Sequence, residues 1–534
     1  MSNVKERVQL TRLGALLIDS LHKIDEFEKQ VANKRKKETV HVPTVGSKLS
    51  TAYEQLRNAS EYAEDDLLQQ RAIRRYLKRV LSFHTKIETK GLAHELVTEL
   101  TQAEYLPNDY TPLSDVEAIA SHINRYYDAY WKYTEKEHRP AKRLAFQDWI
   151  LDILAVRCEQ TLSSHLRQLM FAHFAYSYIH DKIDIKKTVK AHEKITHDDY
   201  AALLYIAIHR SLLKSDNATI RAALLDSYRK DIHDLKEFET YNKRLDYLFE
   251  TKTVAYLSRV VGKNGAALRF IHTGFFCEDA PLAAPSLKSE NALEHGLRQH
   301  IDQEYALLNR KLDRGIIKSV IFLLITKTII GLLIEVPYDY LTHGSIVWLP
   351  LLLNLFFPAV FIAISRLALS TPGMRNTDAV VNQITSMLFV GDYQQYEIKI
   401  PRESRSVGFN TAYAIMFMIM FAALTYVLYI LEFNIVQGVI FFVFLSTASF
   451  LSFRLSRQIQ ELEATHANQG TLSLMRDILY LPFIYVGQQI SYRYSKVNLV
   501  AIVLDILIEL PLKTILRLVR QWTQFLSSKK DELI

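Results

Sequence analysis

The residue with the clearest chemical potential is a lysine inside an apolar stretch. Lys327 lies near the centre of LLITKTIIGLL, within an apolar segment that spans 315–336. A charge at the centre of a bilayer costs at least about 2.5–3.5 kcal/mol on insertion scales. We therefore predict that Lys327 faces a bundle interior near polar groups such as Asn354 or Gln437. Three roles are then open for the side chain. It can make a structural polar contact, it can partly snorkel toward the membrane surface, or it can take part in proton transfer or transport.

Two carboxylates late in the chain are the charged partners that this lysine would need in a transport role. Asp505 and Glu509 lie four residues apart in VNLVAIVLDILIEL and would share one face of a helix. They reach Lys327 only if this segment re-enters the membrane. The alternative prediction is therefore a channel or transporter, which would be a homo-oligomer because four spans are few for a monomeric transporter.

Three adjacent histidine–aspartate pairs occur, at 180–181, 197–198 and 233–234. Imidazole and carboxylate groups can share a divalent ion in such pairs. No H-E-x-x-H or other ligand spacing accompanies them, and the two cysteines, Cys158 and Cys277, form no C-x-x-C motif. We expect no metal, no other cofactor and reduced thiols.

The segment VVGKNGAALRFI, residues 260–271, contains two glycines around a short basic turn. Gly262, Lys263, Asn264 and Gly265 resemble the G-x-x-G loop of KH RNA-binding domains, where close backbone approach holds nucleotide phosphates. The resemblance implies RNA tethering, which is our weaker alternative. A KH fold also needs a three-stranded sheet, which the following residues do not predict. The plainer interpretation is a glycine turn between helices, and we do not expect nucleic acid as a partner.

Four apolar segments are each about 20 residues long, the length that crosses a hydrocarbon core as a helix. They occupy about 315–336, 344–365, 409–431 and 435–453. Basic residues flank only one side of them: Arg310, Lys311, Arg314, Lys318, Arg366, Arg375, Lys399, Arg402, Arg405, Arg454 and Arg457. The opposite connections, PYDYLTHG and LEFNI, contain no lysine or arginine. The positive-inside rule then predicts a multi-pass protein of the cell membrane with both termini in the cytoplasm.

The rest of the chain is predicted to be helical, so the expected fold class is all-α. The 534 residues are 49% hydrophobic and 23% charged, with a net charge of +7. Residues 1–277 contain successive amphipathic helices and form the expected cytosolic domain. A linker and juxtamembrane helix follow at 278–313, and the transmembrane domain, 314–455, includes a cytosolic loop at 366–408. We expect the loop to carry an amphipathic helix along the inner leaflet.

Residues 456–534 are predicted to form helices at the membrane interface. Two apolar segments of about fourteen residues, DILYLPFIYVGQQI and VNLVAIVLDILIEL, are short for spans and indicate interfacial or re-entrant elements. In LKTILRLVRQWTQFL, the basic residues Lys513, Arg517 and Arg520 alternate with apolar ones. That pattern is typical of a helix lying on the membrane surface and binding anionic inner-leaflet lipids.

The sequence contains no Walker loop, nucleophile elbow or kinase signature, which disfavours an enzyme. The outside loops are only about five to eight residues long, so most of the soluble chain would face the cytosol. The leading hypothesis is a polytopic membrane protein that presents a large cytosolic helical domain to a cytosolic protein partner, as an interaction or scaffolding module.

Overall fold

The computed structural model describes residues 9–34, 38–43, 67–189, 193–367, 371–391, 407–464 and 471–496, with single positions at 48, 50, 51, 54, 398, 518 and 522. Across these residues the chain is helical and contains no strand, which confirms the all-α fold class. Two compact units are present. The front unit comprises Arg12–Gly262 and Phe276–Glu278, and the membrane unit comprises residues 9–11, Lys263–Phe275 and Asp279–Val497.

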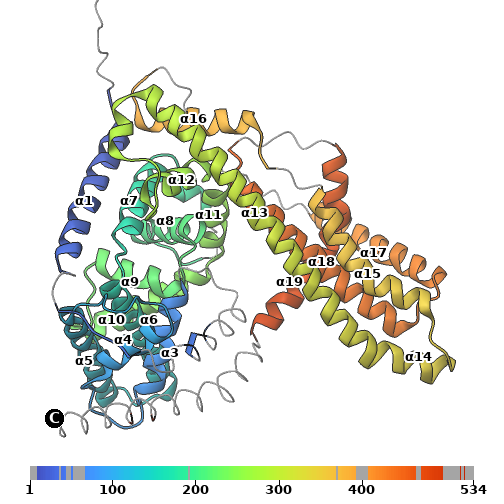
Figure 1. Cartoon of the computed structure of the whole chain (residues 1–534), viewed down its shortest axis with the longest axis horizontal. Coiled ribbons are helices and arrows are strands. Elements are labelled where there is room, and N and C mark those ends of the chain that lie inside the picture. The colour runs from blue at the N-terminus through green and yellow to red at the C-terminus, as the bar shows by residue number, and fades with distance from the viewer. Residues whose placement is uncertain are drawn as a thin grey trace, which may run out of the picture. The chain divides into compact units, whose positions relative to one another are not determined.

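The front unit is a set of helices (Figure 1). Its longer helices are α1 Arg12–Lys34, α3 Leu68–Val80, α4 Leu92–Gln102, α5 Leu113–Lys136, α6 Pro140–Leu162, α7 Leu166–His180, α8 Tyr200–Ile208, α9 Asn217–Ser227, α10 Leu235–Glu250 and α11 Lys252–Lys263. Short helical turns stand between them: η2 Ile185–Thr188, η3 His197–Asp199 and the π-turn η4 His209–Leu213.

The core of the front unit combines aliphatic side chains with a group of packed aromatic rings. On α5, Ile119, Ile123 and Tyr130 recur at helical spacing on the buried face. Tyr133 stacks on Phe146 of α6 with ring centroids 3.9 Å apart, and Phe146 meets Phe238 of α10 at 5.7 Å. This buried cluster joins α3, α4, α5, α6 and α10 into one core, so the front unit has a hydrophobic core of its own.

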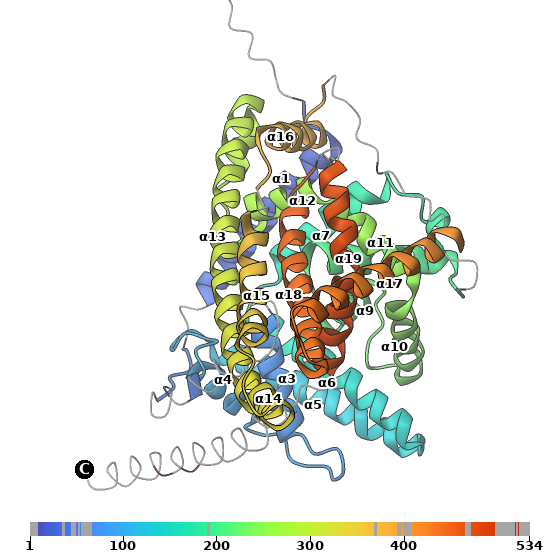
Figure 2. The same ribbon diagram turned by 90° about the vertical axis from the view of Figure 1, so that its right-hand side faces the viewer.

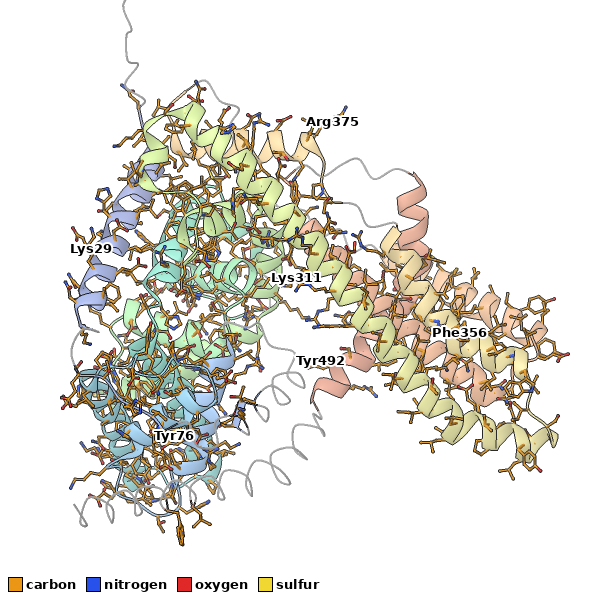
Figure 3. All side chains as sticks on the ribbon, viewed as in Figure 1. Lys29, Tyr76, Lys311, Phe356, Arg375 and Tyr492 are labelled. Carbon is orange, nitrogen blue, oxygen red and sulfur yellow. The ribbon has the colours of Figure 1, made fainter. Side chains whose placement is uncertain are left out.

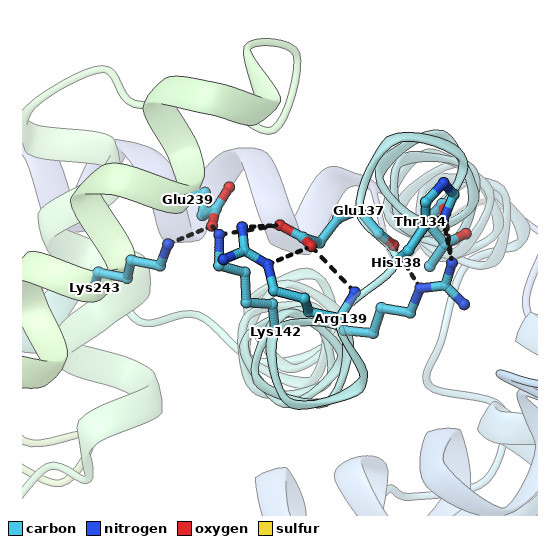
Figure 4. Close-up of polar contacts among 8 residues, drawn as sticks. Thr134, Glu137, His138, Arg139, Lys142, Glu239 and Lys243 are labelled. Carbon is cyan, nitrogen blue, oxygen red and sulfur yellow. Dashed lines mark hydrogen bonds and ion pairs between the residues drawn. The ribbon is translucent and has the colours of Figure 1, made fainter.

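An exposed charge network also connects the α5–α6 turn with α10 (Figure 4). The carboxylate of Glu137 accepts a hydrogen bond from Arg139 Nε at 2.9 Å and lies 3.0 Å from Lys142 Nζ. Glu239 on α10 pairs with Lys243 and lies 3.9 Å from the same Lys142 amine. Hydrogen bonds from Arg139 and then Lys142 hold the pKa of Glu137 well below its usual range.

Among the described residues, the membrane unit contains four helices that are long and apolar enough to cross a bilayer, at the positions of the four predicted spans. Figures 1 and 2 show them beside one another around α18. The elements of this unit are α12 Ala266–Ile271, η5 His272–Phe276, η6 Ala284–Lys288, α13 Glu290–Ile330, the π-turn η7 Gly331–Glu335, α14 Val336–His343, α15 Trp348–Leu367, α16 Met374–Leu388, α17 Val407–Ile430, α18 Ile435–Gln460 and α19 Thr471–Lys496.

Helix α13 continues without a break from its polar first half into the first span. Its 41 residues correspond to a length of about 62 Å. Arg298 forms an ion pair with Asp378 of α16 at 2.6 Å, near the start of the helix. Helix α16 buries its apolar residues, Val380, Val381 and Ile384 among them, and packs against α12 and α13. The amphipathic helix expected along the inner leaflet is therefore covered by protein on its apolar face.

Helix α19 is longer than the fourteen-residue apolar segment that the sequence indicates. It has 26 residues and packs along α18. Phe483 lies 5.0 Å from the ring of Phe421 on α17, and Tyr480 lies 5.4 Å from Phe361 on α15. A Cβ atom at Gly487 would be 2.1 Å from the carbonyl oxygen of Ser446 on α18, so only glycine permits this approach. Thus α19 packs against the helical bundle of the membrane unit, and it is not among the four described helices that are apolar enough to cross a bilayer.

Candidate intramembrane polar site

Lys327 is almost fully buried inside the helical bundle of the membrane unit. Its side chain is 2% exposed, and Nζ lies 3.1 Å from Oε1 of Glu335, whose side chain is 1% exposed. The amine also lies 4.5 Å from the ring centroid of Phe444 on α18, within the range of a cation–π contact. The lysine therefore satisfies its charge within the protein.

A π-turn brings Glu335 onto the face of the helix that carries Lys327. Eight residues of regular α-helix would place it about 80° around the axis from Lys327. The wider turn at Gly331–Glu335 absorbs one extra residue, which reduces this offset to about 20°. Pro337 follows at the start of α14. Proline has no backbone N–H, so one backbone hydrogen bond of a regular α-helix is absent at this point.

Asn354 of α15 connects this ion pair to α18. Its Nδ2 donates to Oε2 of Glu335 at 2.9 Å and lies 3.3 Å from the backbone carbonyl oxygen of Gln437. The asparagine is completely buried, and its Oδ1 has no partner within the described part of the chain. Glu335 thus accepts from a cation and from an amide, and three helical segments meet at its carboxylate.

A second carboxylate, Asp339 of α14, lies at the N-terminal end of α18. Gln437 Nε2 donates to its two oxygens at 3.1 and 2.9 Å, and Asn434 Nδ2 donates at 2.6 Å. Asn434 and Gln437 also cap α18, since each side chain accepts a hydrogen bond from the other's backbone N–H. The positive end of the helix dipole favours an anion at this position.

The network contains one cation and two carboxylates, all with hydrogen-bonding partners. A small pocket of about 100 Å³ borders it, with Lys327, Gly331, Glu335 and Leu351 in its lining. Chemically, the arrangement can clamp the helices together, or it can exchange a proton between the amine and the carboxylate of the pair.

The structure brings together three residues that the sequence singles out: Lys327, Asn354 and Gln437. The ion-pair partner of Lys327 is Glu335, which sequence reasoning missed, as it missed Asp339. Both were visible as acidic residues at the end of the first apolar segment. The suggested partners Asp505 and Glu509 lie outside the described residues, as do the basic residues Lys513, Arg517 and Arg520.

The G-x-x-G segment forms a turn between two helices. Gly262 and Lys263 are the last residues of α11, Asn264 is in the turn, and Gly265 is the N-cap of α12. The helices continue on both sides, and no strand is present in the residues that the structure describes. This geometry matches the plain interpretation of the segment, and RNA binding stays a prediction.

The histidine–aspartate pairs have local structural roles where the structure describes them. Asp234 is the N-cap of α10 and accepts hydrogen bonds from the backbone N–H groups of Lys236 and Glu237 at 3.1 and 3.0 Å. His180 Nδ1 lies 3.3 Å from its neighbour Asp181. Within the described ranges, no three histidine, cysteine, aspartate or glutamate side chains gather closely enough to hold a metal ion.

Comparison of the chain with protein-family models, with curated proteins and with solved structures finds no match. Its function must therefore be argued from the chain's own residues.

Proposed function

We propose that this chain is a multi-pass protein of the cell membrane that presents its front unit in the cytosol to a protein partner. One observation carries the proposal: four helices are apolar enough to span a bilayer, and basic residues flank them on one side only. By this rule both termini and the front unit lie on the cytoplasmic side. The basic flank also supports contact with anionic inner-leaflet lipids.

The side-chain environment of the spans supports a role as an anchor. Phe356 on α15 is half exposed (Figure 3), and Leu332 and Leu333 on the first span are more exposed still, as expected of residues that face lipid. The charged residues Lys327, Glu335 and Asp339 are turned inward and are bonded to protein groups. These pairs can hold the helices of the bundle together.

Cysteine accessibility tests the orientation, because the chain has only two cysteines to remove. In a Cys158→Ala, Cys277→Ser background, Leu341→Cys and Met374→Cys place one thiol on each predicted side; both native side chains are over 80% exposed. A membrane-impermeant maleimide added to intact cells should label Leu341→Cys alone, and both positions after permeabilisation. Labelling of Met374→Cys in intact cells would overturn the proposed topology.

Cross-linking in intact cells tests the interaction role. Exposed lysines of the front unit, such as Lys243, should become linked to a second protein in a fixed ratio, and the links should map to one face of the unit. A result with only intramolecular links would reject the partner.

Proton transfer or transport is the second candidate function. A buried lysine–glutamate pair, a π-turn beside it and the adjacent pocket favour this candidate. Full-length protein in liposomes should then conduct protons above the level of empty liposomes, and Lys327→Met should abolish that flux. Absence of flux from the wild type, or flux unchanged by Lys327→Met, rejects the candidate.

A further inference from the structure

A pocket in the front unit has four arginine and lysine residues in its lining. Its volume is about 430 Å³, and it lies where α5, α6 and the turn after α9 meet. His122 and Arg125 come from one face of α5, and Arg157 comes from α6. Arg229 and Lys230 come from the turn that ends α9. The helices are packed, so these cations are held around a common space.

The charges that line this pocket do not cancel. Four cations, Arg125, Arg157, Arg229 and Lys230, face two acidic residues, Asp226 and Asp231. These acidic residues are already engaged. Arg157 forms a two-pronged ion pair with Asp226, with one contact of 2.7 Å, and Arg125 pairs with Asp231. Of the two remaining cations, Lys230 pairs with Glu237, so the charge of Arg229 has no acidic partner in the described part of the chain.

Arg229 is the cation with the greatest freedom to bind a ligand. Lys230 pairs with Glu237, which lies outside the lining, whereas the Arg229 guanidinium forms no ion pair or side-chain hydrogen bond with any residue that the structure describes. Its backbone is in the left-handed region, at φ 53°, where the helix turn closes through Lys230 N to Leu225 O at 2.8 Å. Glycine is the usual residue at this position of a helix end. An arginine there accepts backbone strain at a position that lines the pocket.

The histidine in the lining reports the same positive environment. Burial, and next the charges of Arg157 and Arg125, hold the pKa of His122 below its usual value. An imidazole beside these two guanidinium groups can donate or accept a hydrogen bond. The site thus combines the Arg229 cation with a neutral polar group, as expected for recognition of an oxyanion.

We propose that this pocket binds a small ligand with a dianionic phosphate monoester group. Such a group carries a charge of about −1.5 to −2 at neutral pH, which complements the Arg229 cation and the basic side chains beside it. Guanidinium groups suit phosphate because their N–H donors form two parallel hydrogen bonds. The volume is in the range of pockets for small molecules and leaves room for an organic group beyond the phosphate. This site is independent of the spans and of any protein partner.

The test uses full-length protein in detergent and isothermal titration with glycerol 3-phosphate at constant ionic strength. The key variant is Arg229→Gly, which removes the cation and relieves the left-handed backbone, so the fold should be retained. Lys214→Gly is the matched control, because Lys214 is also basic, also has φ 53° and lies outside the pocket. We expect Arg229→Gly to weaken binding at least tenfold, which corresponds to about 1.4 kcal/mol. Lys214→Gly should bind like the wild type.

A second experiment distinguishes a phosphate monoester on a lipid headgroup from one on a soluble molecule. Nanodiscs that contain phosphatidic acid present a phosphate monoester as a lipid headgroup, and nanodiscs with phosphatidylglycerol present a diester of lower charge. A lipid ligand would give Arg229-dependent binding in the first nanodisc only, and a soluble ligand would give it with glycerol 3-phosphate only. Either result supports the site. Absence of both, equal binding by Arg229→Gly and the wild type, or equal loss in Lys214→Gly would overturn it.

Discussion

The buried ion pair of the first span allows a sharp mutational prediction. Lys327→Met keeps a long, flexible side chain and removes the cation. Glu335 would then retain only the amide donor of Asn354, at 2.9 Å, while remaining 1% exposed. A carboxylate left in this environment has lost its partner but cannot regain water.

The size of the effect follows from that burial. Removing one member of a buried ion pair typically costs about 3–5 kcal/mol, because the remaining charge is uncompensated. Replacing both members with apolar residues of similar volume is often close to neutral. We therefore expect Lys327→Met to lower the free energy of unfolding by about 3–5 kcal/mol, and the double variant Lys327→Met, Glu335→Leu to recover most of the loss.

The measurement is denaturant titration of full-length protein in mixed micelles, followed by tryptophan fluorescence. Ile325→Met is the matched control, since it adds methionine two residues away at a position that is 56% exposed. The control should differ from the wild type by less than about 0.5 kcal/mol. If Lys327→Met were as stable as this control, or if the double variant lost the sum of both single losses, the pair would not be a desolvated salt bridge.

Three further outcomes are expected. Gly487→Ala should lower stability by about 1–3 kcal/mol in the same titration, because its Cβ would overlap the Ser446 carbonyl; an unchanged midpoint would show that α18 and α19 are not in close contact. Burial lowers the pKa of His209 to about 4, below the value of about 6.5 in an unfolded chain, so protons bind the unfolded state more strongly. The contribution of His209 to the free energy of unfolding is complete above pH 6.5, and about 3 kcal/mol of it is lost as the pH falls toward 4. The variant His209→Gln should flatten this pH dependence. A variant with an equally steep pH dependence would contradict the assignment. Asp234→Ala should cost about 1 kcal/mol by removing the N-cap of α10, whereas Asp234→Asn should cost little; equal losses would argue against capping.

The features that sequence could predict depend on length and periodicity. Spans about 20 residues long and helices with apolar residues at three- and four-residue spacing follow from counting. The inward position of Lys327 follows from the cost of a charge in lipid, and Asn354 and Gln437 are polar residues at comparable depth. These inferences need no knowledge of neighbouring helices.

The remaining features depend on geometry that a linear pattern does not contain. A regular helix places Glu335 away from Lys327, and only the π-turn between them brings the two together. Asp339 is explained by the capping residues of α18, almost a hundred positions later. The phosphate pocket combines α5, α6 and α9, whose basic residues are unremarkable when read singly.

Because α13 is a continuous helix, the number of residues along it fixes how two distant contacts are oriented relative to each other. Arg298, near the start of α13, pairs with Asp378, and Lys327, near its end, pairs with Glu335. The helix is continuous between Arg298 and Lys327. Inserting or deleting one residue there would twist one contact by about 100° relative to the other. This stretch should therefore tolerate many substitutions of similar residues but no change in its length.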